Sequence, residues 1–460
     1  MGQTVHLSRQ GETALIEIDN PPVNALSQSV RAGLLDALDQ AEADPAIKVI
    51  ALLGRGKVFI AGADIKEFGK PPQVPILPDV ITRLEHSEKA IVAILHGVAL
   101  GGGLEVALGC HYRVAFSDTR LGLPEVKLGL LPGAGGTQRM PRLTGLVTAA
   151  EWITEGKLVD AKTALDSGLI DDITAVASAQ EAALDVAKNW KEGTITLRKT
   201  GELPNASVDT KALEKIRQRL LEQSPELYSP FRILEALEAS CTLPLADGLA
   251  RERELFFQCM DSPQRAGLIH HFFASNAIGK VPGSDAPVSI TRLVLKGDHP
   301  IFLTLDDHPL VQLYAATSPG MEVWVETASE AAQPATVDVT VIDPDTDTAQ
   351  TDQAFSLLPI PDSKWLELVD HREQPAVQQA LMKVLKAAGF TIIPSKHRSI
   401  YRLLRASLKD STEHQSSLET AALAAAQAGL CYRMSDIDVL AIETLGYPKH
   451  LGGPHFQAIA

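Results

Sequence analysis

The segment Val98–Gly136 constrains the fold of this chain more than any other part of the sequence. It places a triple glycine, Gly101–Gly103, in an apolar run, and it carries Glu105 and Glu125, twenty positions apart (125 − 105). Glycines let backbone N–H groups approach a ligand closely, and a helix that begins there presents unpaired N–H groups to it. Burial raises carboxyl pKa values towards neutral pH, where carboxyls serve as general acids and bases. The segment therefore predicts either a catalytic carboxyl pair on a glycine-packed helix or two acids at that helix's solvated edge.

A second loop upstream completes this pattern. The apolar run Val49–Leu53 is typical of a buried strand, and small residues follow it at Ala61–Ala63. Small residues allow a backbone amide to face a bound carbonyl group. Together with the Gly102 amide, the Ala63 amide would form a two-donor oxyanion hole.

Strand and helix patterns alternate along the first half of the chain, which indicates an α/β fold. The expected elements are a hairpin at Val5–Leu7 and Ala14–Ile18, a helix at Ser27–Ala43, a strand at Ile47–Leu53, a helix at Val80–Lys89 and a strand at Ile91–His96. The proline-rich segment Pro71–Pro78 is interpreted as a flap near the site.

Composition narrows the functional class. The 460 residues, 45% of them hydrophobic, suffice for two to four domains. A net charge of −15 disfavours nucleic acid as a partner. Four scattered cysteines lack the paired spacing of a zinc site, so we expect reduced core thiols and no metal. Neither a signal peptide nor a membrane span is evident, and a cytoplasmic location is expected.

Four ordered motifs resemble those of the crotonase, or enoyl-CoA hydratase/isomerase, superfamily. They are NPPVNALS, FIAGADIKEF, HGVALGGGLEVALGC and LGLPEVKLGLLPGAGGTQR, which begin at residues 20, 59, 96 and 121. They are most similar to the hydratase half of the multifunctional fatty-acid β-oxidation enzymes. The resemblance implies a crotonase-type ββα spiral core over residues 1–190.

The resemblance also implies roles for individual residues. Glu105 and Glu125 would be catalytic, and Ala63 and Gly102 would form the oxyanion hole. Five residues are expected to bind coenzyme A or the acyl group: Ala25, Ala61, Asp64, Ile65 and Gly133. For Asp64, capping of a helix is an equal alternative.

The implied activity is hydration of 2-trans-enoyl-CoA in β-oxidation-type degradation, with Δ3-Δ2-enoyl-CoA isomerisation as an extension. Coenzyme A is then part of the substrate, and no separate cofactor is expected. Two alternatives stay open. One is a crotonase-fold CoA hydrolase or lyase, and the other is a hydratase subunit whose second half docks a partner dehydrogenase or thiolase.

Residues 191–283 have charged helical periodicity, and Asp261–Gly283 resembles the helix that links hydratase to dehydrogenase in the multifunctional enzymes. In crotonases the helices after the core fold back over it, and they complete the acyl pocket or the subunit interface. We therefore expect residues 191–283 to form a helical extension and a linker helix.

The remainder resembles a shortened 3-hydroxyacyl-CoA dehydrogenase, with an eroded Rossmann-like α/β segment over residues 284–405 and a small helical segment over 406–460. Between Ser284 and Ala428 the only glycines are at 297, 320 and 389, so no dinucleotide-binding turn is present. Where the family has its catalytic His and an Asn, this chain has Phe355 and Tyr401. His371 is the alternative base. Pro334–Asp352, rich in Thr, Asp and Pro, is interpreted as a loop or eroded structure. Neither NAD binding nor dehydrogenase activity is expected.

Overall fold

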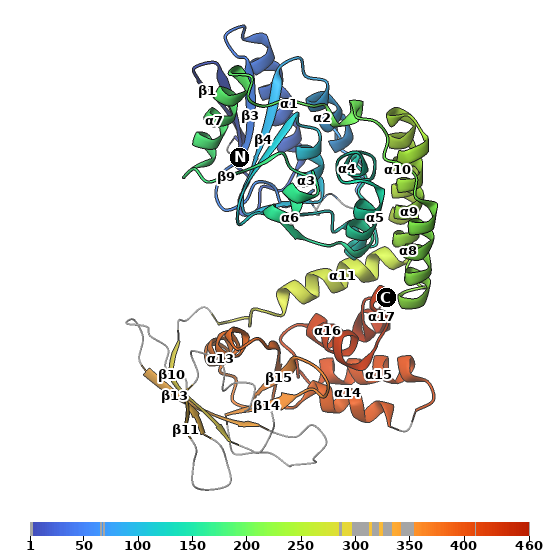
Figure 1. The fold of residues 1–460 in the computed structure, drawn as a ribbon. Coiled ribbons are helices and arrows are strands. Elements are labelled where there is room, and N and C mark those ends of the chain that lie inside the picture. The colour runs from blue at the N-terminus through green and yellow to red at the C-terminus, as the bar shows by residue number, and fades with distance from the viewer. Residues whose placement is uncertain are drawn as a thin grey trace. The chain divides into compact units, whose positions relative to one another are not determined.

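A computed structural model describes residues 3–64, 67, 70–284, 288–296, 312–314, 322–324, 334–341, 354–409 and 411–459 of the chain. The chain divides into two compact units, Met1–Arg265 and Ala266–Ala460. Each unit has its own hydrophobic core, and Figure 1 labels their elements.

The first unit is built on a six-stranded sheet within the described residues, in the order β1-β2-β3-β4-β6-β9. Its strands are β1 (Val5–Gln10), β2 (Thr13–Ile18), β3 (Val49–Gly54), β4 (Ala90–Leu95), β6 (Tyr112–Phe116) and β9 (Asp172–Thr174). The antiparallel hairpin β1–β2 confirms the predicted hairpin, and every other neighbouring pair is parallel. Parallel neighbours require crossover connections, which explains why strands and helices alternate in the sequence.

Helices cover both faces of this sheet. They are α1 (Gln28–Ala43), α2 (Leu77–Glu85), α3 (Gly102–Leu108), α4 (Gly136–Thr144), α5 (Leu146–Glu155), α6 (Ala161–Asp166) and α7 (Ala179–Lys191). On one face, α7 packs Ala183 and Val186 against strand residues such as Leu15 and Ala51. The main core lies on the other face, because alternate strand residues such as Ile16 point there.

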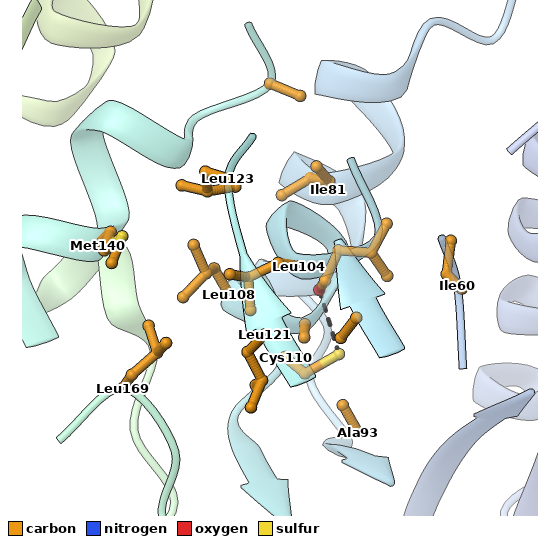
Figure 2. Close-up of a cluster of buried hydrophobic side chains, with 14 of the residues drawn as sticks. Ile60, Ile81, Ala93, Leu104, Leu108, Cys110, Leu121, Leu123, Met140 and Leu169 are labelled. Carbon is orange, nitrogen blue, oxygen red and sulfur yellow. Dashed lines mark hydrogen bonds between the residues drawn. The ribbon is translucent and has the colours of Figure 1, made fainter. Parts of the chain in front are cut away.

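Helix α3 lies entirely inside the main core, and all seven of its residues are buried. Figure 2 shows Leu104 and Leu108 among Leu121, Leu123 and other apolar side chains. The adjoining Cys110 donates its thiol to the Val106 carbonyl, with sulfur and oxygen 3.4 Å apart, and burial raises the pKa of this thiol to about 12. Glu105 is only 3% exposed, so the solvated-edge alternative for Glu105 is wrong.

A small second sheet positions the loops that meet at the site. It consists of β5 (Val98–Leu100), β7 (Arg120–Gly122) and β8 (Val159–Asp160), in the order β5-β7-β8. A bridge between Ile60 and Ala99 joins the loop after β3 to β5, and the Leu100 N–H donates to Ile60 O at 3.1 Å. The 3₁₀ helix η2 (Glu125–Leu128) follows β7 directly.

Residues after the core pack back onto it. The elements are η3 (Thr200–Glu202), α8 (Thr210–Gln223), α9 (Ser229–Thr242) and α10 (Leu245–Met260). Leu234, Leu237 and Leu255 belong to the main hydrophobic core. The predicted boundary at residue 190 is therefore not a boundary of compact units, because the apolar faces of α8–α10 are buried against the core.

The predicted linker helix forms as α11 (Gln264–Ala277), but the unit boundary falls at its start and not at residue 283. His270 Nε2 contacts Asp438 Oδ2 at 2.9 Å, and His271 Nε2 contacts Glu443 Oε1 at 3.1 Å. These contacts pair both α11 histidines with carboxylates of the second unit.

The second unit contains a mixed five-stranded sheet within the described residues, in the order β10-β13-β14-β15-β16. Its strands are β10 (Ser289–Lys296), β13 (Pro334–Val341), β14 (Phe355–Pro359), β15 (Trp365–Asp370) and β16 (Thr391–Lys396), and β11 (Gln312–Tyr314) pairs separately with β12 (Glu322–Trp324). The interpretation of Pro334–Asp352 as a loop is wrong for Pro334–Val341. Val337, Val339 and Val341 alternate with Asp338 and Thr340, so their buried apolar side chains line one face of a strand.

Helices complete this unit. They are α13 (Pro375–Ala387), α14 (Ile400–Leu408), α15 (His414–Gln427), α16 (Met434–Leu445), η4 (Lys449–Leu451) and α17 (Pro454–Ile459). The predicted boundary at residue 405 falls inside α14. Tyr401 and Leu404 of α14 share one core with Leu418 and Ile437, so α14 packs with the C-terminal helices.

Candidate active site

The first part of the site is a pair of backbone amides. Asn24, with φ of 54°, donates its side-chain amide to the carbonyls of Arg55, Val58 and Phe59 at 2.9–3.1 Å. The Leu26 N–H donates to Gly62 O at 2.9 Å, and Leu26 forms a parallel bridge with Ala63, which fixes the loop that carries Ala63.

Gly102 opens α3, where N–H groups have no acceptor within the helix. A Cβ built on Gly102 would lie 3.5 Å from the Ala63 nitrogen and 2.8 Å from Leu77 Cδ2. Ala63 and Gly102 are therefore close neighbours, and both line one cavity. Their role as an oxyanion hole stays a prediction.

Glu105 provides the first carboxyl group. It is 3% exposed, and its Oε1 accepts hydrogen bonds from the Ala134 and Gly136 N–H groups at 2.8 Å each. Burial raises the pKa of Glu105, although these two hydrogen bonds act in the opposite direction. The loop after η2 thus holds one carboxylate oxygen in a defined position.

Glu125 provides the second carboxyl group. A Cβ built on Gly101 would lie 2.9 Å from Glu125 Oε1, so the carboxyl group lies beside this glycine, whose φ of 51° other residues rarely adopt. Burial raises the pKa of Glu125 well above its ordinary value, and the charges of Glu105 and then Glu252 raise it further. Among the described residues, no group donates a hydrogen bond to Glu125 Oε2. A raised pKa favours the protonated form of Glu125, which suits the role of a general acid.

The two carboxyl groups and the two amides line a cavity of about 280 Å³. Its apolar wall comes from distant parts of the first unit: Ile76, Leu77, Pro78, Leu128, Leu130, Leu131, Phe256, Phe257 and Met260. Pro71 also lines it, as expected for the proline-rich segment, and Arg31 donates to the carbonyls of Gln73 and Pro75. An apolar cavity with a few convergent polar groups suits a small ligand with a hydrocarbon part.

The predicted binding residues are placed as follows. Asp64 and Gly133 line the cavity. Ala61 donates its N–H to Val23 O, and Leu26, which follows Ala25, donates its N–H to Gly62 O. Neither Ala25 nor Ala61 lines this cavity. Ile65 lies outside the described residues. The contacts of these residues with coenzyme A stay a prediction.

Helix α10 contributes a third carboxyl group that the motifs did not predict. Glu252, 1% exposed, accepts hydrogen bonds from the Gly135 N–H at 2.6 Å and from the Thr137 N–H at 2.9 Å. Burial and then the charge of Glu105 raise the pKa of Glu252 to about 8. One sequence pattern could have revealed Glu252: it is the only charged residue on the buried face of α10, which consists of Gly248, Glu252, Leu255 and Cys259.

In the second unit, the residues at the predicted dehydrogenase positions are buried among apolar side chains. Phe355 is completely buried in an apolar cluster, and Tyr401 is 4% exposed in another. His371 lies between Ser356 Oγ and the His397 carbonyl, at 2.8 Å from each. The turn after β10 lies outside the described residues. In the parts that the structure describes, no helix has the length and apolar character to cross a membrane, and no cluster of three metal-ligating side chains occurs.

Comparisons with known proteins point to one family. The family model for enoyl-CoA hydratase/isomerase matches residues 8–224. The peroxisomal bifunctional enzyme of Danio rerio is 39% identical over 269 residues, 58% of this chain and 37% of that protein. A peroxisomal fatty acid beta-oxidation multifunctional protein of Arabidopsis thaliana is 35% identical over 294 residues, 61% of this chain and 41% of that protein.

A solved structure also matches. The crystal structure of an enoyl-CoA hydratase from Bacillus anthracis is 26% identical, with a TM-score of 0.39, and the match covers 59% of this chain and 96% of that one. The chain spans about two fifths of the length of the curated relatives that it matches.

Proposed function

We propose that this protein adds water across the 2-trans double bond of an acyl-CoA thioester, because the family model for enoyl-CoA hydratase/isomerase matches residues 8–224. The observation that carries the proposal is the pair Glu105 and Glu125, the first buried and the second half-buried, which lines one cavity with Ala63 and Gly102. Acyl-CoA is the substrate, and the proposal requires no further cofactor.

In the proposed reaction the thioester oxygen lies between the Ala63 and Gly102 N–H groups. Glu105 and Glu125 hold one water molecule, whose oxygen attacks C3 of the enoyl group. Negative charge then develops on the thioester oxygen, where the two N–H groups stabilise it. Glu125 delivers a proton to C2, and the carboxyl pair recovers a proton from the water, so hydroxyl and hydrogen are added overall.

Δ3-Δ2-enoyl-CoA isomerisation is an extension of this proposal. It needs one group that removes a proton from C2 and returns it at C4, and Glu125 has the raised pKa that suits proton return. The alternatives of a CoA hydrolase or lyase need no second carboxyl group beside the oxyanion hole. Retention of both glutamates therefore favours hydration.

A panel of 2-trans-enoyl-CoA substrates from short to long chain tests the activity. We expect the absorbance of the conjugated thioester to fall with time and 3-hydroxyacyl-CoA to accumulate by mass spectrometry. Release of free coenzyme A thiol in place of the hydroxyacyl product would support a hydrolase instead. No turnover of any chain length would contradict the proposal.

We further propose that the second unit has no dehydrogenase activity and does not use NAD. Hydride transfer from a 3-hydroxyl group needs a base within hydrogen-bond reach, and the side chain of Phe355 has no proton acceptor. His371, the alternative base, is engaged at both ring nitrogens. A second proposal is that the second unit docks a partner dehydrogenase or thiolase. The cytoplasmic location also stays a proposal.

Incubation with 3-hydroxyacyl-CoA and NAD⁺ tests this absence. We expect no NADH absorbance to appear and calorimetry to detect no saturable NAD⁺ binding. NADH formation that disappears in a His371→Phe variant would overturn the proposal and assign the base. Affinity purification with mass spectrometry would identify a docked dehydrogenase.

A further inference from the structure

We propose that Glu252 of α10 is a positioning residue for Glu105, and that it acts through the loop Ala134–Thr137. This inference rests on the proposed hydratase function. It adds a third carboxyl group, from a helix outside the four motifs, to the machinery of the site. It also gives the packing of α10 a catalytic purpose beyond covering the core.

The hydrogen bonds of residues 134–137 alternate between two carboxyl groups. Ala134 and Gly136 donate their N–H groups to Glu105 Oε1 at 2.8 Å each. Gly135 donates to Glu252 Oε1 at 2.6 Å, and Thr137 donates its N–H and its hydroxyl to Glu252 Oε2 at 2.9 and 2.5 Å. Successive N–H groups thus point to opposite sides, and the loop is clamped between Glu105 and Glu252.

Packing of the helix interface does not explain why residue 252 is a glutamate. Burial of a carboxyl group carries a large desolvation penalty, whereas a leucine would extend the buried stripe of α10 without one. Helices α10 and α4 approach each other closely near Glu252. A Cβ on Gly248, one turn before Glu252, would lie 2.2 Å from Gln138 Oε1, so glycine lets α10 contact α4.

The clamp matters because it holds the residues at which the chain enters α4. The loop contains two glycines, and Gly135 has φ of 105°, a conformation that other residues rarely adopt. Without the Glu252 carboxylate, the N–H groups of Gly135 and Thr137 would lose their acceptors inside the protein. The loop would then shift, and Glu105 Oε1 would lose its fixed donors at the place where the water must be held.

A double-mutant cycle with Glu252→Gln and Glu105→Gln tests the inference, with kcat and KM measured on a 2-trans-enoyl-CoA. Glutamine keeps the size of the side chain but replaces one acceptor oxygen with a donor. We expect Glu252→Gln alone to lower kcat about tenfold to a hundredfold, as small misplacements of a catalytic group do. KM should change by less than about twofold, because the thioester contacts are untouched.

In the Glu105→Gln background, Glu252→Gln should lower kcat by less than about twofold further, because its action passes through Glu105. Equal fold losses in both backgrounds, or a loss carried by KM, would overturn the inference. An unchanged kcat in Glu105→Gln alone would also overturn the inference, because Glu252 is proposed to act through Glu105. The proposed function fails only if the native protein hydrates no enoyl-CoA, so the two failures are distinguishable.

Thr137 offers a second route that leaves both carboxyl groups in place. Thr137→Val removes the hydroxyl donor to Glu252 Oε2 at nearly constant volume, whereas Thr137→Ser retains it. We expect Thr137→Val to lower kcat and Thr137→Ser to stay near the native value. Equal kcat for the two variants would contradict the clamp.

The matched control is Glu254→Gln on the same helix. Its carboxylate is 58% exposed and pairs with Arg251 at 2.6 Å. The control should leave kcat unchanged, and circular dichroism should show that all variants fold.

Discussion

Replacement of Glu125 with glutamine is expected to lower kcat for enoyl-CoA hydration at least about a hundredfold, within the range of a general acid–base group. Glutamine keeps the volume and the polar contacts of the side chain but has no carboxyl proton to deliver to C2. The measurement is the initial rate of absorbance loss of the conjugated thioester, across the full range of chain lengths.

Glu88→Gln is a matched control, because Glu88 is exposed and lies before β4, outside the cavity. It should keep native turnover. The pH dependence gives an independent check of the same role. Because the pKa of Glu125 is raised, the protonated acid persists above the ordinary carboxyl range, and kcat/KM should fall as the pH rises through that pKa. Near-native activity of Glu125→Gln on every chain length would show that the assignment of Glu125 is wrong.

Arg139→Met is expected to lower the free energy of unfolding by about 3–5 kcal/mol, the usual effect of removing one partner from a buried ion pair. Arg139 of α4 and Glu85 of α2 are 2% and 4% exposed, and Arg139 Nη2 lies 2.8 Å from Glu85 Oε2. The substitution would leave the Glu85 carboxylate buried with the Gly201 N–H, which donates to Oε1 at 2.6 Å. Urea unfolding followed by circular dichroism measures the loss.

The double variant Glu85→Leu/Arg139→Met should recover much of this stability, because no unpaired charge then remains buried. Lys162→Met, which breaks the exposed pair with Asp166, should change stability little.

Burial acts to raise the pKa of Glu85, but the hydrogen bonds and charge of Arg139 hold it below its ordinary value. The stabilisation is therefore present above the ordinary carboxyl pKa and is lost as the pH falls through the lowered one. A double variant no more stable than Arg139→Met would contradict this account.

Much of the first unit was predictable from local patterns. The hairpin β1–β2, the strands β3 and β4 and the helix α1 follow from hydrophobic periodicity, which depends on residues close in the sequence. The positions of Glu105 and Gly102 followed from motifs for a similar reason. The triple glycine, the apolar helix and the carboxyl group all lie within a few residues of one another.

Other features depend on contacts that no local pattern encodes. The β13 strand escaped prediction because Thr, Asp and Pro raised the polarity of a segment whose valines alternate. The unit boundary lies at the start of α11 and not at residue 190, because α8–α10 bury their apolar faces against the first core and α11 pairs its histidines with the second unit.

The sequence by itself determined the α/β class of the first unit, the two glutamates and the two amides that would serve the reaction. Only the tertiary structure decided what surrounds them. Glu252 lies 147 positions after Glu105 (252 − 105), and its carboxylate reaches the Gly135–Thr137 loop only because α10 docks against α4. Phe256 joins the cavity wall for the same reason. Spacing along the chain specifies which groups one segment carries, but the packing of distant segments specifies which groups share a cavity.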